Sequence, residues 1–214
     1  QGLGRMPIDV DRLGADLASF SGHKSHGPKG TGGLYVRRRG RAVRLEPLVF
    51  GGGQERGLRS GTLDVPGIVG FAAAARLANA DLPGDEARMR LLRDRLWSLL
   101  SHGIDGVRLN GPALDACDAS GHPIRLVNNL NLHVPGVDGQ TLLATLSADG
   151  LAVSSGSACA SESPRPSHVL MAIGRDEDEA RASLRFGLSR FTTEREVDEA
   201  AARVVGGVAR LREL

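Results

Sequence analysis

The amino-acid sequence predicts a mixed α/β fold, in which strands and helices alternate along the chain. Short apolar stretches, some with strand-like alternation, recur between longer segments whose apolar residues return every three or four positions. Glycine-rich loops separate these segments, and no repeat or low-complexity tract interrupts them. An apolar share of 41% over 214 residues is enough for a packed core. Such a succession of elements is typical of α/β and α+β enzymes.

Strands are expected where short apolar or alternating stretches lie between loops. The stretch over 17–21 is expected to be a buried strand, and the segment 22–33, with five glycines, is expected to be a loop. A second glycine-rich loop is expected over 51–62. The other expected strands cover residues 33–37, 44–49, 130–134 and 184–188.

Helices are expected where apolar residues repeat at helical spacing behind a start signal. Asp64 precedes a helix with Pro66 in its first turn. A capping box from Thr193 to Glu196 starts the last helix, whose apolar face runs to Leu211. The other two expected helices cover residues 89–100 and 142–146.

Composition and charge exclude several classes of partner. Lys and Arg number 27 against 25 Asp and Glu, so the net charge of +2 gives no reason to expect nucleic-acid binding. No apolar run approaches the ~20 residues needed to span a bilayer, so no membrane association is expected. Two cysteines in so long a chain form no disulfide framework, which is typical of a reducing compartment and predicts a cytoplasmic protein.

The chain is expected to be a piece of a longer protein with two domains. It opens at Gln1 without a starting methionine or a signal segment, and it reads like the interior of a domain. A polar stretch with proline and glycine over 79–86 is the best candidate for a domain boundary. It divides the chain into residues 1–80 and 81–214.

The first candidate for a functional residue is Lys24, in the stretch Ser-Gly-His-Lys over 21–24. A lysine amine can form a Schiff base with a carbonyl compound. The hydroxyl of Ser21 and the imidazole of His23 can donate hydrogen bonds to a phosphate, and Gly22 lets the backbone approach closely. This set is typical of a pyridoxal phosphate site, with the lysine amine buried. The same residues are also compatible with an ordinary lysine in a surface loop.

The second candidate is Cys159. The loop over 154–163 contains almost no bulky apolar residue, so the thiol is expected to be exposed and mobile, able to accept a group and pass it on. The thiolate is the reactive form of such a side chain. Cys117, between Asp115 and Asp118, has no neighbour that favours a thiolate and is expected to be a small buried apolar residue.

The third candidate is Arg185, within the strand expected over 184–188. The two-residue period of a strand places it on the face opposite Leu184 and Phe186. An arginine directed away from the apolar face can bind a carboxylate with two parallel hydrogen bonds. The alternative is an ordinary solvated arginine on a strand.

Two other clusters are expected to have no catalytic role. His23 and His26 have no carboxylate or cysteine nearby, so no metal site is expected. The arginines over 37–44 are expected to form a solvated edge, with a docking surface for an acidic partner as the alternative.

Four motifs together resemble those of the cysteine desulfurases, in the group with a long cysteine loop that includes the enzymes of iron–sulfur cluster assembly. The motifs are Ser-Gly-His-Lys over 21–24, Gly-Pro-Lys-Gly over 27–30, Gly-Gly-Gly-Gln-Glu-Arg-Gly-Leu-Arg-Ser-Gly-Thr over 51–62 and Ser-Ser-Gly-Ser-Ala-Cys over 154–159. They stand in the family's order, and the resemblance covers essentially the whole chain. It implies a fold-type I pyridoxal phosphate-dependent transferase, with residues 1–80 as the C-terminal part of the large cofactor-binding domain and 81–214 as the small α+β domain.

The resemblance implies a role for each candidate residue. Lys24 would bind pyridoxal 5'-phosphate and move protons on the substrate, and Arg185 would bind the substrate's carboxylate. Cys159 would take the sulfur of L-cysteine as a persulfide, for transfer to an iron–sulfur scaffold or another sulfur acceptor, while L-alanine is released. The remaining cofactor-binding residues that it implies are Ser21, Gly22 and His23 at the phosphate, Gln1 at the ring oxygen, and Thr62, which serves the neighbouring subunit's cofactor in a homodimer.

Three alternative functions stay open at this point. A selenocysteine lyase would use the same lysine, and a class V aminotransferase would not need Cys159. A truncated chain could also serve only as an inactive docking or dimerisation module. Since further cofactor-binding groups of the family are expected upstream of Gln1, the 214 residues alone are expected to bind the cofactor poorly and to be inactive.

Overall fold

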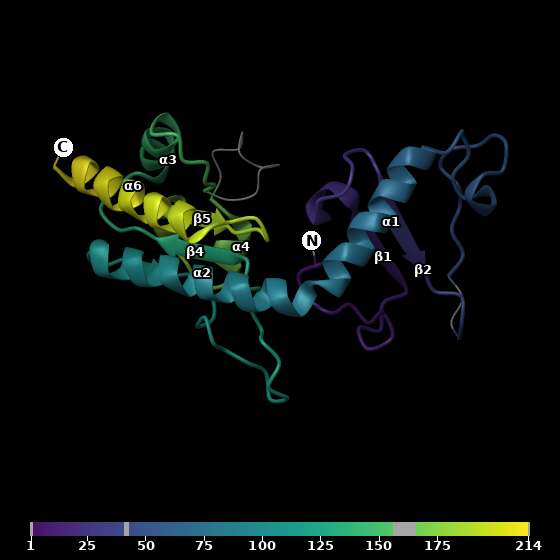
Figure 1. The fold of residues 1–214 in the computed structure, drawn as a ribbon, viewed down its shortest axis with the longest axis horizontal. Helices are drawn as coiled ribbons and strands as arrows, with labels where there is room; N and C mark the ends of the chain where they lie inside the picture. Colours follow the sequence, from purple (N-terminus) through teal and green to yellow (C-terminus); the bar gives the residue numbers. More distant parts are fainter. Residues whose placement is uncertain (1, 41–42, 156–165, 214) are drawn as a thin grey trace. The chain divides into compact units, whose positions relative to one another are not determined.

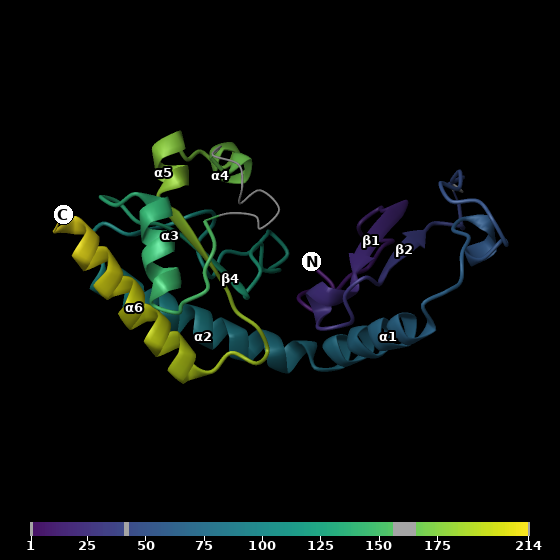
Figure 2. The ribbon, with the colours of Figure 1, turned by 90° about the horizontal axis from the view of Figure 1, so that it is seen from above.

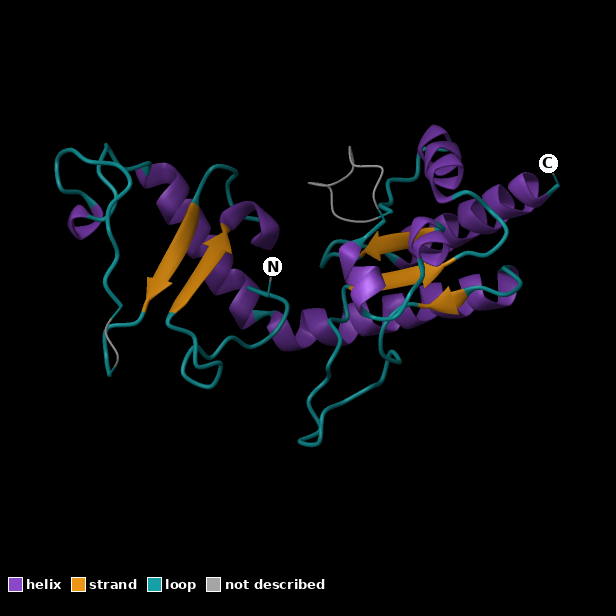
Figure 3. Cartoon of the chain, turned by 180° about the vertical axis from the view of Figure 1, so that it is seen from behind, coloured by secondary structure: helices purple, strands orange, loops and turns teal. Residues whose placement is uncertain are grey.

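The structure, a computed structural model, describes residues 2–40, 43–155 and 166–213. The chain forms two compact units, Gln1–Pro83 and Gly84–Leu214. Each unit combines strands with helices (Figures 1 and 3), so the mixed α/β class expected from the sequence is confirmed. None of the helices in these ranges is both long and apolar enough to cross a membrane.

The first unit is built on an antiparallel hairpin with one long helix beside it. Its elements are β1 (Leu17–Ser21), the 3-10 helix η1 (Gly22–Ser25), β2 (Gly32–Val36), the 3-10 helix η2 (Glu55–Gly57) and α1 (Val65–Ala80). The two strands pair with Leu17 opposite Val36. The Phe71 ring of α1 is so near that a side-chain carbon added at Gly22 or Gly33 would lie 3.3 Å from it. The hairpin and α1 therefore pack closely (Figure 2).

Three expectations for the first unit are wrong in whole or in part. Residues 44–49 form no strand, since no described strand pairs with them. Leu48 within this range and Phe50 just after it are 93% and 80% exposed. The glycine-rich stretch 22–33 is not all loop, because its first four residues form η1. β1 alternates between exposed and half-buried residues instead of being buried, because β2 is its only partner strand among the described residues.

The second unit is built on a three-stranded antiparallel sheet in the order β3-β4-β5. Its elements are α2 (Leu82–Gly103), which begins just before the division between the units, β3 (Arg108–Leu109), β4 (Asn129–His133), α3 (Gly139–Ala148), α4 (His168–Ala172), α5 (Glu177–Arg181), β5 (Ser183–Gly187) and α6 (Glu194–Arg212). The elements expected over 89–100, 130–134, 142–146, 184–188 and 193–211 are confirmed.

One face of this sheet forms a hydrophobic core with α2, α3 and α6. The central buried side chains are Leu92, Leu96, Leu100, Leu130, Leu132, Leu142, Leu146, Leu184, Phe186, Val197, Val204 and Val208. α2 and α6 lie side by side (Figures 1 and 2) and are joined by an ion pair of Arg95 with Asp198 at 2.7 Å. This core belongs entirely to the second unit. In the first unit, the buried apolar residues among those described are Ala78 and Leu82.

Side-chain caps that the sequence predicts start two of the helices. The Asp64 carboxylate accepts a hydrogen bond from the Gly67 backbone N–H at 3.1 Å, at the beginning of α1. At the beginning of α6, Glu196 accepts from the Thr193 N–H at 2.7 Å, and the Thr193 hydroxyl accepts from the Glu196 N–H at 3.2 Å. This reciprocal pair is the predicted capping box.

Candidate functional site

The lysine segment follows directly on β1 and forms η1. Gly22 and Ser25 are buried, whereas Ser21, His23 and Lys24 are exposed. The expectation of a buried Lys24 amine is therefore wrong for the described chain. η1 packs against α1, where a side-chain carbon added at the buried Gly22 would lie 3.3 Å from the Phe71 ring.

Backbone hydrogen bonds at Gly22 hold the turn that carries Lys24. The Gly22 N–H donates to the Thr31 carbonyl at 2.8 Å, and its own carbonyl accepts from the Gly27 N–H at 3.0 Å and the Ser25 hydroxyl at 3.1 Å. A side-chain carbon at Gly22 would lie 2.8 Å from the Thr31 oxygen, so glycine alone fits this position. The backbone that presents the lysine is thus fixed by its own bonds.

Ser21, His23 and Lys24 offer a hydroxyl, an imidazole and an amine on one short turn. Within the described ranges, none of the three side chains forms a hydrogen bond or an ion pair. A hydroxyl and an imidazole N–H suit the oxygens of a phosphate, and a lysine amine suits an aldehyde. This donor set therefore fits a phosphorylated aldehyde such as pyridoxal phosphate. Gln1, the candidate for the ring oxygen, lies outside the described residues.

The second glycine-rich loop ends at Thr62, whose side chain is exposed. The Gln54 side-chain oxygen accepts from the Gly61 N–H at 3.1 Å and so ties the loop across its base. Glu55 and Arg56 have left-handed φ angles of 51° and 60°. That conformation is strained for residues with a side chain, and strain of this kind is often found at functional sites.

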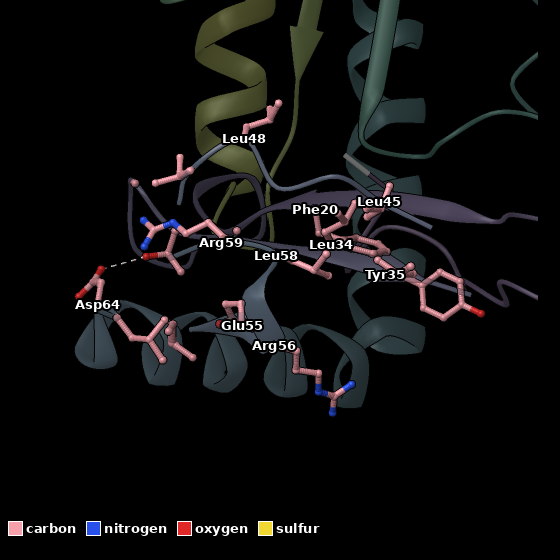
Figure 4. A pocket seen from close by; sticks show the side chains of 18 of the residues that line it. Phe20, Leu34, Tyr35, Leu45, Leu48, Glu55, Arg56, Leu58, Arg59 and Asp64 are labelled. Atoms are coloured by element: carbon pink, nitrogen blue, oxygen red, sulfur yellow. Dashed lines mark hydrogen bonds between the residues drawn. The ribbon is translucent and has the colours of Figure 1, made fainter. Parts of the chain in front are cut away.

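A cavity of about 1080 Å³ lies in the first unit, between the hairpin and the second glycine-rich loop. Figure 4 shows Phe20 and Tyr35 of the hairpin and Leu58 and Arg59 of the loop among its lining side chains. Neither Lys24 nor the phosphate-binding candidates beside it line this cavity. The cavity is therefore distinct from the turn that fits the cofactor.

Arg185 lies on β5 in the second unit, on the face of the sheet away from the core. Its neighbours Leu184 and Phe186 are buried in the core, whereas Arg185 itself is half-buried. The orientation predicted from strand alternation is confirmed. The Arg185 guanidinium has no hydrogen bond or ion pair with a residue of the described part, so its fork of N–H donors can serve a ligand.

Ser154 connects the cysteine segment to Arg185, a link that the sequence does not predict. The Ser154 N–H donates to the Arg185 carbonyl at 3.1 Å, and the Arg185 N–H donates to the Ser154 carbonyl at 2.6 Å. The residue at which the predicted cysteine loop begins is thus bonded to the backbone of the carboxylate-binding candidate. Cys159 itself lies outside the described residues.

Cys117 is exposed, so the expectation that it is buried is wrong. Its Sγ donates to the carbonyl of Asp115 at 3.4 Å. The Asp118 carboxylate accepts from the N–H groups of Ser120 and His122 at 2.8 and 2.9 Å, which folds this stretch into a solvated turn. Among the described residues, no group of three or more His, Cys, Asp or Glu side chains is placed to hold a metal ion.

The run of arginines over 37–44 predicts a solvated edge, but Arg37 does not belong to one. Its side chain is 17% exposed and donates to the carbonyls of Val10 at 2.9 Å and Ala15 at 3.1 Å. It also donates to the Asp11 carboxylate at 2.6 Å. These bonds tie the turn before β1 to the residue after β2, so Arg37 has a structural role.

Comparison with known sequences gives one matching family and several similar proteins. Residues 1–200 match the family described as aminotransferase class-V. The chain is 49% identical over 214 residues to the "Cysteine desulfurase, mitochondrial" of Arabidopsis thaliana, and covers 45% of that protein. It is 50% identical over 214 residues to the "Cysteine desulfurase IscS" of Edwardsiella ictaluri, and covers 50% of it. The chain thus spans about half the length of the curated relatives it matches.

Solved structures of similar proteins show the same fold as this chain. A "NIFS-LIKE PROTEIN" superposes with a TM-score of 0.79 at 38% identity, over 99% of this chain and 51% of that one. A NifS-like protein from Rickettsia africae superposes with a TM-score of 0.77 at 29% identity, over 100% of this chain and 52% of the other. The resemblance drawn from four sequence motifs and the fold class it implies are confirmed.

Proposed function

The chain belongs to the class-V aminotransferase family, and from this premise we propose that it works as a pyridoxal phosphate-dependent cysteine desulfurase. The observation that carries the proposal is the identity of 45% to 50%, over all 214 residues, with relatives named cysteine desulfurase. The exposed donor turn at Lys24 and the open guanidinium of Arg185 support it, since the reaction needs a Schiff-base lysine and a group that binds an amino-acid carboxylate.

On the cofactor side, the first unit would act as the C-terminal part of the cofactor-binding domain. The amine of Lys24 would hold the cofactor's aldehyde and afterwards carry a proton to and from the substrate carbon. The Ser21 hydroxyl and the His23 imidazole, on either side of Gly22, would donate to its phosphate. Gln1 and Thr62 are assigned by the resemblance alone, the latter to the cofactor of a second subunit in a homodimer. The cofactor would supply the electron sink for the reaction.

On the substrate side, Arg185 would bind the carboxylate of L-cysteine and Cys159 would accept its sulfur. The Cys159 thiolate forms an S–S bond with the substrate sulfur as the substrate's C–S bond breaks. The electron pair of the C–S bond stays with the carbon, which takes up a proton. The products are L-alanine and a persulfide on Cys159.

The persulfide is a carrier and not an end product, so the proposal includes a protein partner. We place a sulfur acceptor, such as an iron–sulfur scaffold, after the persulfide step, with the enzyme as a cytoplasmic homodimer. The two cysteines of the sequence support a reducing compartment. No metal ion takes part in the proposed chemistry.

The test is the stoichiometry of product formation by the full-length protein that contains this chain. With pyridoxal phosphate and L-cysteine, we expect L-alanine, and we expect Lys24→Ala to lose both the cofactor's absorbance and alanine formation. The isolated 214 residues serve as a second sample, for which we expect little cofactor binding and no turnover. A full-length protein that binds the cofactor but forms no alanine from cysteine would overturn the proposal.

The same assay separates the alternative functions. Cys159→Ser is expected to abolish transfer of sulfur to an acceptor thiol. A variant that still released selenide from L-selenocysteine, at the rate of the unchanged protein, would indicate a selenocysteine lyase. Amino-group transfer to a keto acid without any persulfide would indicate an aminotransferase.

A further inference from the structure

The sheet of the second unit has one apolar and one polar face. The apolar face packs into the core, while successive residues on the other face are polar along all three strands. The polar side chains on that face are Arg108, Asn110, Asn129, Asn131, His133, Ser183 and Arg185. One apolar and one polar face are usual for an antiparallel sheet, and here the polar face contains the proposed carboxylate-binding residue.

Asn131 of β4 is the residue directly opposite Arg185 of β5. The backbone N–H and carbonyl of Arg185 bond to Ser154 on the other side of β5. The Asn131 carbonyl likewise bonds away from β5, accepting from the Asn110 N–H at 2.9 Å. Asn131 and Arg185 are therefore a non-hydrogen-bonded pair, the kind in which the two Cα atoms are about 4.5 Å apart and the side chains are closest.

A chain of hydrogen bonds with a fixed direction orients the Asn131 amide. It begins at the carbonyl of Glu179, which can only accept, so the Ser183 hydroxyl must donate its single proton there at 2.7 Å. The Ser183 oxygen then accepts from the Asn110 Nδ2 at 2.9 Å, and the same Nδ2 donates to the Asn131 Oδ1 at 2.6 Å. Ser183 and Asn110 are 0% and 2% exposed, so water does not compete for these bonds.

The result is a pair of side chains that present donors only. The Asn131 oxygen is occupied, which leaves its NH₂ group with two N–H bonds that no described residue accepts. The guanidinium of Arg185 next to it has no acceptor in the described part of the chain either. Since neither group can accept from the other, the pair suits an anionic acceptor with two oxygens.

We propose that Asn131 is a second substrate-binding residue, whose amide N–H donates to the carboxylate that Arg185 binds. The inference rests on the proposed function, in which the substrate is an amino acid. Arg185 supplies the charge, and Asn131 adds a neutral donor at an angle fixed by Asn110 and Ser183. Asn110 and Ser183 are positioning residues, since they act on the ligand only through Asn131.

The test compares two ligands in the full-length protein. L-cysteine carries a carboxylate, and cysteamine has the same amine and thiol without it. Asn131→Asp keeps the oxygen that accepts from Asn110 but replaces the NH₂ donor by a negatively charged oxygen. We expect its KM for L-cysteine to rise about ten- to hundred-fold, as for the loss of a hydrogen bond to a charged group, while its affinity for cysteamine stays unchanged.

Two further variants control the result. Asn129→Ala makes a change on the same strand and face, opposite Gly187 instead of Arg185, and is expected to leave the affinity for L-cysteine unchanged. Asn131→Ala is expected to raise the KM for L-cysteine in the same range as Asn131→Asp. If Asn131→Ala is unstable, Asn131→Leu takes its place, because both variants remove the donor without placing a carboxylate beside the Arg185 guanidinium, as Asn131→Asp does.

The possible failures are distinguishable. An Asn131→Asp variant with an unchanged KM for L-cysteine, in a protein where Arg185→Ala raises it, would overturn the inference and leave the proposed function intact. Equal losses of affinity for L-cysteine and cysteamine would also overturn the inference, because they would indicate a structural role. A protein in which Arg185→Ala has no effect would overturn the carboxylate site itself.

Discussion

At the scale of single residues, the side chain of Arg185 lies on the polar side of a sheet whose other side is the core. Its planar guanidinium can bind both oxygens of a carboxylate at once, which a lysine ammonium cannot do. We expect Arg185→Lys to raise the KM for L-cysteine about tenfold or more and to change kcat less. Initial rates of alanine formation over a range of cysteine concentrations measure both.

Arg195 provides the matched control for this change. It is exposed on α6, where its guanidinium pairs with Glu199 at 2.7 Å. Arg195→Lys therefore makes the same substitution at a position outside the sheet's polar face. We expect wild-type kinetics for Arg195→Lys. An Arg185→Lys variant with the wild-type KM would contradict the role of a bidentate arginine.

His133 of β4 is a buried imidazole with a defined proton. Its Nδ1 donates to the Glu179 carbonyl at 3.2 Å, since a carbonyl can only accept. Burial lowers the pKa of His133 below its ordinary value of 6.5, and the nearby Arg108 cation lowers it further. The hydrogen bond to Glu179 and the carboxylate of that residue act in the opposite direction, while Arg175 adds a second lowering charge. His133 is therefore expected to be neutral in the folded protein at neutral pH.

The lowered pKa of His133 predicts how stability depends on pH. Between the lowered pKa and 6.5 the unfolded chain binds more protons at this position than the folded protein, so stability falls as the pH drops below about 6.5. His133→Gln removes the titration but keeps an N–H donor. We expect wild type to lose more stability than this variant from about pH 7.5 to about pH 5.5 in urea unfolding. If the stabilities of wild type and His133→Gln changed in parallel with pH, a lowered pKa of His133 would be contradicted.

At the scale of elements, the two backbone hydrogen bonds between Ser154 and Arg185 extend the sheet beyond β5. They involve no side chain of Ser154. Ser154→Pro removes the N–H that donates to Arg185, and we expect it to lower both stability, by about 1–3 kcal/mol, and alanine formation. Thermal unfolding and turnover of the full-length variants measure the two effects.

Ser154→Ala is the control for this element, because it keeps the backbone N–H and carbonyl. It should behave like wild type in both measurements. If Ser154→Ala and Ser154→Pro lost activity equally, the Ser154 hydroxyl and not the backbone pairing would be responsible.

At the scale of the whole chain, the two units differ in how much apolar surface they bury. The hydrophobic core lies in the second unit, while Leu48 and Phe50 of the first unit are almost fully exposed. Regions with few buried apolar contacts open at a lower free energy. In hydrogen exchange of the 214-residue chain we expect slow amides in β4, β5 and α6 and fast amides in β1 and β2. Equal protection in the two units would contradict this difference.

The sequence predicts the second unit far better than the first, for a physical reason. Leu130, Leu184 and Val204 repeat with the period of their elements because each contacts a common core, so pattern and burial agree. Residues 44–49 have a similar apolar content but no partner among the described strands, so the pattern there predicts a strand that does not form.

For the candidate site too, the sequence predicts only what a local pattern determines. The face of Arg185 follows from strand alternation alone. The exposure of Lys24, the pairing of Ser154 with Arg185 and the link from Asn110 to Asn131 depend on contacts between distant segments and on the register of the sheet. A single sequence contains no local signal for these contacts.

The most direct test of the central claim is the mass of the cysteine-containing peptides after the full-length protein reacts with L-cysteine without a reductant. We expect the peptide with Cys159 to gain the mass of one sulfur atom and the peptide with the exposed Cys117 to stay unchanged. Lys24→Ala should abolish the gain. An unchanged Cys159 peptide in a protein that forms alanine, or a gain on Cys117 instead, would contradict the account.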